Sequence, residues 1–258
     1  MLKYIGYALV AIILVLLGYY LIISQTSSAP RNKEVAVNGE FVNYFEGVKG
    51  YYAEPAEGRR FPGIIIVHEW WGLNDSIAGM AEELAAEGYR VLAVDLFEGE
   101  VAATSTNAQA LVAAVDQGRS IANMKAAEKY LRDKGVTGMG LLGWCFGGGQ
   151  ALQLALSEEE ELDAMVIYYG TPLITDAGQL ERIDWPLMGV FGDNDRAIPV
   201  ATIDQFKQAL NDADVDNEVY VYPGVGHAFA NPSNGENYAP TEAADAWEKT
   251  LAFLEDNL

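Results

Sequence analysis

Two hydrophobic patterns alternate along most of the chain: short, continuously apolar runs and longer segments with a single apolar stripe. The runs lie at residues 63–67, 89–95, 136–144, 164–169, 187–191 and 219–222. Runs of this kind are typical of strands buried on both faces of a sheet. The striped or helix-rich segments, which predict helices between the strands, lie at residues 76–87, 109–133, 149–156, 199–210 and 241–254. This alternation predicts an α/β fold with a mostly parallel, doubly wound sheet.

A different pattern opens the folded part of the chain. Residues 41–45 and 49–53 flank the turn Glu46-Gly47-Val48 and predict an antiparallel hairpin before the first parallel strand. We place the start of the α/β domain just before this hairpin, so the domain covers residues 39–258.

The N-terminal residues 4–23 form an uncharged run rich in Leu, Ile and Val. Such a run is long enough to span a bilayer, whereas the apolar region of a cleavable signal peptide covers about 7–15 residues. We therefore expect residues 1–23 to be a single transmembrane anchor or uncleaved signal, and residues 24–38 to be a polar tether. Cleavage of residues 1–29 as a signal peptide is the alternative. Lys3 on one side nearly balances Arg31 and Lys33 on the other, so the positive-inside rule leaves both orientations open, including an extracytoplasmic domain.

Composition limits the chemistry of the domain. The chain has 258 residues and a net charge of −21, which disfavours nucleic acid as a partner. Cys145 is the single cysteine, so an internal disulfide is impossible, and the thiol is either inert packing or a reactive group. With two histidines, His68 and His227, a multi-histidine metal site is not expected, and we expect no metal or organic cofactor. The sequence favours no particular oligomeric state.

The single cysteine lies at a strand-to-helix corner. Gly143-Trp144-Cys145-Phe146-Gly147-Gly148 has the pattern G-x-C-x-G, which is the nucleophile elbow of α/β-hydrolases with cysteine in place of serine. The turn is so sharp that the residues two before and two after the nucleophile must lack bulk, which explains Gly143 and Gly147. The helix that follows points its N-terminus at the sulfur and favours a thiolate there. The alternative is a small buried cysteine in a glycine-rich turn.

Two further residues follow in the order that an α/β-hydrolase triad requires. Asp195 lies in the segment after the 187–191 strand, and His227 lies in the segment after the 219–222 strand. The order nucleophile, acid, base, each at the exit of a strand, predicts that Cys145, Asp195 and His227 meet at one edge of the sheet. His227 would then exchange a proton with the thiol, and Asp195 would orient the imidazole.

The segment His68-Glu69-Trp70-Trp71-Gly72 leaves the 63–67 strand at the place where this fold supplies an oxyanion donor. The backbone N–H groups of Trp70 and Phe146 are therefore the candidate oxyanion hole. Glu69 is unusual here because an ionised carboxylate would repel a developing oxyanion. It either takes part in proton transfer with the thiol or faces the solvent.

These motifs, with Gly192-Asp193-Asn194-Asp195 and Gly226-His227-Ala228-Phe229, resemble the dienelactone hydrolase family over about residues 40–258. The resemblance implies an α/β-hydrolase fold, a Cys145–His227–Asp195 triad, and a role for Glu69 as acceptor of the thiol proton when substrate arrives. It also implies a carboxymethylenebutenolidase-type hydrolase that cleaves a small-molecule ester or lactone through an acyl-cysteine intermediate.

One feature departs from that family. Its founding enzymes grip the substrate carboxylate with arginines, whereas the corresponding segments here are 96–100 and 229–231 and contain no arginine. We therefore expect a neutral substrate. The residues expected to line an apolar substrate pocket are Trp71, Phe97, Tyr168 and Phe229.

Two other functions remain open from the sequence. A thioesterase or acyltransferase could use the same acyl-cysteine, and a non-catalytic binding module could keep the pocket without turnover. The complete set of Cys145, Asp195, His227 and Glu69 argues against the binding module.

Overall fold

The structure, a computed structural model, describes residues 36–58, 60–157 and 162–258. The predicted anchor (residues 1–23) and most of the predicted tether lie outside these ranges. Within them, no helix is both long enough and apolar enough to cross a bilayer. The membrane anchor therefore stays a prediction.

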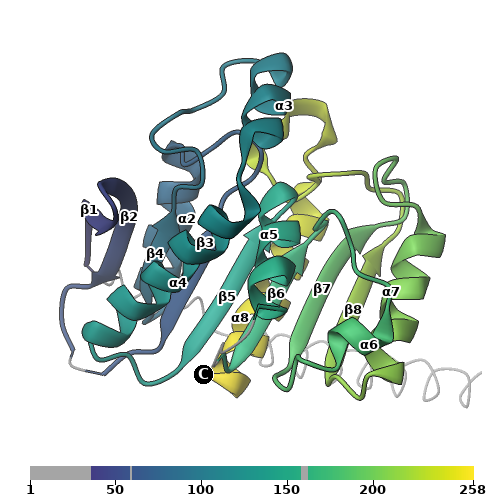
Figure 1. The fold of residues 1–258 in the computed structure, drawn as a ribbon. Coiled ribbons are helices and arrows are strands. Elements are labelled where there is room, and N and C mark those ends of the chain that lie inside the picture. Colours follow the sequence, from purple (N-terminus) through teal and green to yellow (C-terminus); the bar gives the residue numbers. More distant parts are fainter. Residues whose placement is uncertain (1–35, 59, 158–161) are drawn as a thin grey trace, which may run out of the picture. The chain divides into compact units, whose positions relative to one another are not determined.

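The described residues form one eight-stranded sheet, shown in Figure 1. Its order is β1-β2-β4-β3-β5-β6-β7-β8. Strands β1 and β2 form the predicted hairpin and pair antiparallel, β2 also pairs antiparallel with β4, and the remaining pairs are parallel. The strands are β1 (Val37–Phe45), β2 (Val48–Pro55), β3 (Gly63–Val67), β4 (Arg90–Val94), β5 (Met139–Trp144), β6 (Ala164–Tyr168), β7 (Leu187–Gly192) and β8 (Asn217–Tyr222).

Helices cover both faces of this sheet. In Figure 1, α4 and α5 lie in front of the strands and α8 lies behind them. Every residue of β3, β5, β6 and β7 is buried, as expected for strands covered on both sides. The helices are α2 (Asp75–Ala86), α3 (Ser105–Ala114), α4 (Gln117–Asp133), α5 (Phe146–Ala155), α6 (Ala177–Leu180), α7 (Val200–Asp212) and α8 (Pro240–Asn257), with a 3₁₀ segment η1 (Pro232–Asn237).

One predicted helix is wrong. The segment 109–133 belongs to two helices, because Val115 is extended (φ −64°, ψ 125°) and ends α3. The Asp116 carboxylate then accepts a hydrogen bond from the Arg119 N–H (2.8 Å) and caps the start of α4. Aspartate is a strong N-cap residue, so the chain starts a new helix there.

The sheet places the candidate residues together. Cys145 directly follows β5, and Asp195 and His227 lie in the loops after β7 and β8. These strands are parallel, so their carboxyl ends meet at one edge.

Candidate active site

Cys145 sits in a strained turn between β5 and α5. Its backbone has φ 53° and ψ −120°, a conformation that residues with a side chain rarely adopt. A Cβ at Gly143 would lie 2.4 Å from the Gly147 carbonyl oxygen, and one at Gly147 would lie 2.2 Å from the Val67 carbonyl oxygen. A side chain at either position would therefore clash with the backbone, as predicted from the sequence.

The turn brings the thiol to the N-terminus of α5. Phe146 is the first residue of this helix, so its N–H has no acceptor within the helix. The helix dipole and this free N–H favour negative charge beside Cys145. Trp70 begins the turn after β3. The Gly72 N–H closes this turn by donating a hydrogen bond to the Glu69 carbonyl oxygen (3.1 Å). The two predicted oxyanion donors thus lie in segments that border the thiol.

His227 joins the thiol to a carboxylate. Its Nε2 lies 3.0 Å from the Cys145 Sγ, and its Nδ1 lies 2.7 Å from Asp195 Oδ2. The other Asp195 oxygen accepts hydrogen bonds from the Ala197 N–H (2.7 Å) and the Ile198 N–H (3.2 Å). Asp195 is therefore fixed by its own loop, and it can hold the imidazole in one orientation.

The environment of His227 favours its protonated form. Burial alone would lower the pKa of His227, but hydrogen bonds to Asp195 and Cys145, with the charges of both groups, raise it to about 10. An imidazolium at this position stabilises a negative sulfur. The arrangement can therefore hold a nucleophilic thiolate.

This shift has a consequence for stability. The pKa of His227 is higher in the folded chain than the value of about 6.5 expected after unfolding, so protonation favours the folded state. The contribution is complete below about pH 6.5 and is lost as the pH rises toward 10. We expect His227→Gln to lower the free energy of unfolding more at about pH 6 than at about pH 10. Urea unfolding of the wild type and the variant at both pH values measures this difference. A loss that is equal at both pH values would contradict this linkage.

Glu69 is buried and turned inward, which excludes the solvent-facing alternative. Its Oε2 accepts a hydrogen bond from the Asn231 side-chain amide. Its Oε1 is also buried, and the buried hydroxyl of Tyr169 acts on the Glu69 carboxyl group as a second hydrogen-bond donor. Burial raises the pKa of Glu69, against the lowering effects of the Asn231 hydrogen bond and the charge of His227. The result is a carboxyl group that can accept a proton readily.

His68 contacts the backbone of this glutamate and the backbone of Leu96. Its ring is fully buried, its Nδ1 lies 2.6 Å from the Glu69 carbonyl oxygen, and its Nε2 accepts a hydrogen bond from the Leu96 N–H (3.1 Å). Burial lowers the pKa of His68, which fits a neutral ring that donates at Nδ1. The histidine therefore ties the segment after β3 to the segment after β4.

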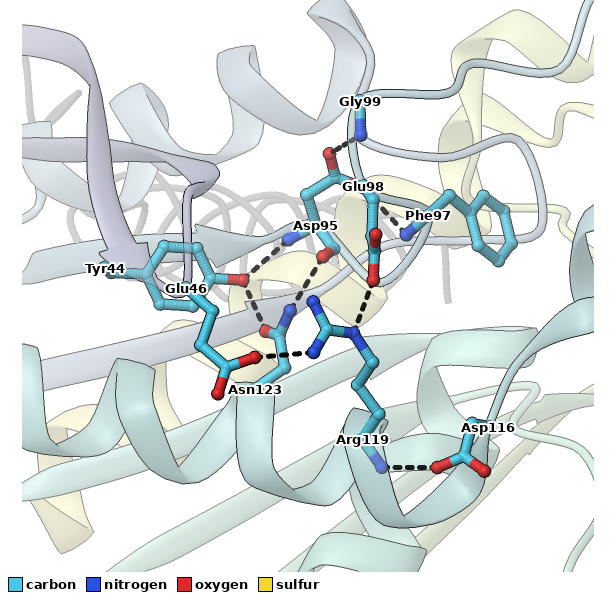
Figure 2. A network of polar contacts seen from close by, with 9 residues as sticks. All are labelled: Tyr44, Glu46, Asp95, Phe97, Glu98, Gly99, Asp116, Arg119 and Asn123. Atoms are coloured by element: carbon cyan, nitrogen blue, oxygen red, sulfur yellow. Dashed lines mark hydrogen bonds and ion pairs between the residues drawn. The ribbon is translucent and has the colours of Figure 1, made fainter.

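The segment after β4 has its own polar support, shown in Figure 2. The Asp95 carboxylate accepts hydrogen bonds from the Phe97 N–H (2.9 Å) and the Gly99 N–H. Tyr44 accepts a hydrogen bond from the Asp95 N–H (3.1 Å), and the Asn123 side chain donates to the Asp95 carbonyl oxygen (2.9 Å). These contacts join the hairpin, the segment after β4 and α4.

Arg119 belongs to this support and not to the substrate cavity. Its guanidinium pairs with Glu98 at 2.5 Å and with Glu46 at 2.7 Å, as Figure 2 shows, and it lies over the ring of Phe45. Its charge is therefore matched by two carboxylates.

The thiol opens into a cavity of about 630 Å³, a volume typical of small-molecule sites. Its walls include Cys145, His227 and Glu69 together with the two tryptophans Trp70 and Trp71. The other lining residues are Asn74, Ser76, Ile77, Met80, Ala102, Trp144, Thr171, Ala197, Ala228, Asn231, Ser233, Asn234 and Asn237. None of these eighteen residues is a lysine or an arginine.

Three residues predicted for the pocket do not line the cavity at the thiol, which corrects that prediction for this cavity. Phe97 is buried against His68, at 4.7 Å between ring centroids. Tyr168 is buried with its hydroxyl 2.7 Å from the Thr250 hydroxyl, and it borders a neighbouring cavity. Phe229 is fully buried and packs on Tyr169. Trp71, the fourth, does line the cavity.

Sequence reasoning gave no role to two asparagines beside the triad. Asn231 contacts Glu69, and the Asn234 side-chain amide donates to the carbonyl oxygens of His227 and Ala228, both at 3.1 Å. Their position shortly after His227 in the chain is the signal that could have drawn attention to them. Among the described residues, no group of three or more His, Cys, Asp or Glu side chains could hold a metal ion.

Comparison with known proteins agrees with this geometry. Residues 48–258 match the dienelactone hydrolase family. The chain is 32% identical to "Protein usf" of Aquifex pyrophilus over 220 residues, covering 82% of this chain and 94% of that protein. It is 31% identical to a Methylorubrum extorquens protein named "Putative carboxymethylenebutenolidase", covering 78% of this chain and 74% of that one.

A solved structure described as a "Putative Dienelactone Hydrolase" from Klebsiella pneumoniae is also similar. It superposes with a TM-score of 0.77 at 25% identity, and the match covers 85% of this chain and 99% of that one. The protein is therefore a hydrolase with the α/β-hydrolase fold and belongs to the dienelactone hydrolase family.

Proposed function

We propose that the protein hydrolyses a neutral ester or lactone through an acyl-cysteine intermediate. The observation that carries this proposal is the chain of contacts from the Cys145 sulfur through His227 to Asp195, at 3.0 and 2.7 Å, beside an open cavity. A nucleophile, a base and an orienting acid in this geometry are the parts that acyl transfer requires.

The reaction has two stages. The Cys145 thiolate attacks the carbonyl carbon, the bond to the leaving oxygen breaks, and His227 gives that oxygen a proton. Water, deprotonated by His227, then attacks the thioester and releases the acid, which restores the thiolate and the imidazolium. The N–H groups of Trp70 and Phe146 stabilise the oxyanion in both stages.

Glu69 serves the first stage. Its carboxyl group lines the same cavity as the thiol and is itself buried. If the free enzyme holds Cys145 as a thiol beside an already protonated His227, Glu69 takes up the thiol proton when substrate enters, because burial raises the pKa of Glu69. This transfer forms the thiolate–imidazolium pair that begins the first stage, and the proton returns from Glu69 to the sulfur when the product leaves.

The charged residues that line the cavity support the proposal of a neutral substrate. The eighteen residues that line the cavity include the carboxyl group of Glu69 and no cationic side chain other than His227. A substrate carboxylate would enter without a permanent cationic partner, at a cost of about several kcal/mol if buried.

A burst experiment tests the mechanism. When the protein is mixed with a p-nitrophenyl ester in excess, rapid release of about one equivalent of p-nitrophenol is expected, followed by slower turnover. Intact-protein mass spectrometry at the end of the burst should show a mass increase of one acyl group, located on the Cys145 peptide. An acyl group on any other residue would refute the assignment of Cys145.

The proposal includes a membrane anchor at residues 4–23, on the strength of their uncharged, apolar sequence. We expect the full-length chain to sediment with membranes and to resist carbonate extraction, whereas a chain without residues 1–30 should be soluble and active. Fractionation with a blot for the C-terminus and N-terminal sequencing measures this. Full-length protein in the soluble fraction with Met1 retained would refute the anchor.

A further inference from the structure

Cys145 borders two cavities and not one. Besides the 630 Å³ cavity described above, a smaller cavity of about 300 Å³ reaches the thiol from the side of α3 and α5. Val112, Val115, Phe146 and Pro172 make its walls largely apolar. An ester has two parts, an acyl group and a leaving alcohol, so two cavities at the nucleophile offer one place for each.

The larger cavity continues along α2. A third cavity of about 530 Å³ shares Ser76, Met80 and Trp144 with it. Ser76 and Met80 lie one turn apart on α2, and Gly79 and Glu83 extend this wall toward α8. We call the two adjoining cavities together the α2–α8 groove.

The far part of the groove has the chemistry of an apolar chain site. Ala230, Pro232, Ala243 and Trp247 are among its lining residues, and no lysine or arginine is. Glu83 is its one carboxylate, and burial raises the pKa of Glu83 against the lowering effect of a hydrogen bond from Trp247, which favours the uncharged form. Met80 lies between the two cavities, and an unbranched thioether side chain can shift to admit a ligand.

His227 decides which half of the ester belongs in the groove. Its ring borders the larger cavity and does not border the smaller one. The leaving oxygen must come within hydrogen-bond reach of His227 Nε2 to receive its proton. The alcohol therefore departs on the groove side, and the acyl group lies in the smaller cavity.

We propose that the substrate is a neutral ester with a short acyl group and a long apolar alcohol, whose chain runs past Met80 into the α2–α8 groove. This inference rests on the proposed ester hydrolysis at Cys145 and narrows it to one substrate class.

Gly79 allows the groove to be filled without endangering the fold. It lies inside α2, its φ is not positive, and a Cβ built on it would meet no atom within 4 Å. Replacing glycine inside a helix also favours the helix. Gly79→Leu should therefore fold and occupy part of the groove.

Ala243→Phe fills the same space from the α8 wall and serves as an independent variant. Ala252→Leu is the control, because Ala252 is exposed on α8 and lines none of the three cavities.

The experiment uses the full-length chain and two ester series. Ethyl, butyl and hexyl acetates vary the alcohol, and p-nitrophenyl acetate, butyrate and hexanoate vary the acyl group. Each buried methylene is worth about fourfold in binding, so we expect kcat/KM to rise at least about tenfold from ethyl to hexyl acetate. Gly79→Leu and Ala243→Phe should each reduce this hexyl-to-ethyl ratio at least about fivefold, while Ala252→Leu should keep the wild-type ratio.

Two results with the groove variants would overturn the inference. In one, both groove variants keep the wild-type hexyl-to-ethyl ratio. In the other, the dependence on chain length appears in the acyl series and the groove variants remove it there, which would place the acyl group in the groove. Hydrolysis of ethyl acetate at Cys145 without a preference for long alcohols would refute this inference alone, whereas absence of any ester hydrolysis would refute the proposed function as well.

Discussion

Replacing Cys145 with alanine is expected to lower kcat for ester hydrolysis by about 10⁴-fold or more, because the sulfur forms the bond to the substrate. Alanine has the same Cβ as cysteine, so it fits the turn at φ 53° as cysteine does. The folded structure should persist, and the burst of p-nitrophenol should disappear. Steady-state kinetics and thermal unfolding of both proteins measure the two effects.

Cys145→Ser is the matched control for this variant. A serine hydroxyl keeps the geometry but needs a stronger base than a thiol does, so its activity should fall well below that of the wild type. Alanine and wild-type proteins of equal activity would end the acyl-cysteine mechanism. Loss of activity together with loss of the folded state would point instead to a structural role for Cys145, which the thermal unfolding curves would reveal.

The reacting residues could be predicted because short-range sequence dictates their positions. Only residues without a side chain fit at Gly143 and Gly147, where a Cβ would lie within 2.4 Å of backbone oxygens. The parallel sheet then brings every strand exit to one edge, so Asp195 and His227 could be placed from the order of strands alone. The strands themselves were predictable since their continuous apolar runs are long and clear.

The aromatic pocket could not be predicted in the same way. Phe97, Tyr168 and Phe229 lie at or after strand exits just as Trp71 does, so their local patterns are alike. Whether such a ring faces the cavity or the core depends on which helices cover it. The Tyr168 hydroxyl, for example, contacts Thr250 of α8, and Tyr168 borders the cavity beside α8 and not the cavity at the thiol.

The surroundings of Glu69 could not be predicted from the local sequence either. Its partner Asn231 lies 162 positions away in the sequence, and nothing local links the two residues. This contact gives the segment after His227 a different role from the one that it has in the founding enzymes of the family. In place of an arginine for a substrate carboxylate, it provides an amide that holds the carboxyl group of the protein itself.

The asparagine in place of an arginine leads to a prediction about the charge of the substrate. In a matched series of esters or lactones, the neutral compound is expected to exceed its carboxylated analogue in kcat/KM by at least about tenfold, which needs only about 1.4 kcal/mol of differential binding. The lining of the cavity provides Glu69 and no lysine or arginine, and the net charge of −21 opposes the approach of anions at low salt. Steady-state kinetics with a free dienelactone acid and its methyl ester, at low and high ionic strength, measure the ratio.

Salt separates the two causes of this preference. The effect of the net charge should shrink at high ionic strength, whereas the effect of the cavity lining should persist because buried groups are poorly screened. If the carboxylated compound were the better substrate, a cation other than His227 would have to reach the cavity. Arg119 already pairs with Glu46 and Glu98, so the exposed Arg196, whose neighbour Ala197 lines the cavity, would be the residue to replace first. Loss of the anion preference in Arg196→Gln would then locate the cation and show that the substrate enters over the loop after β7.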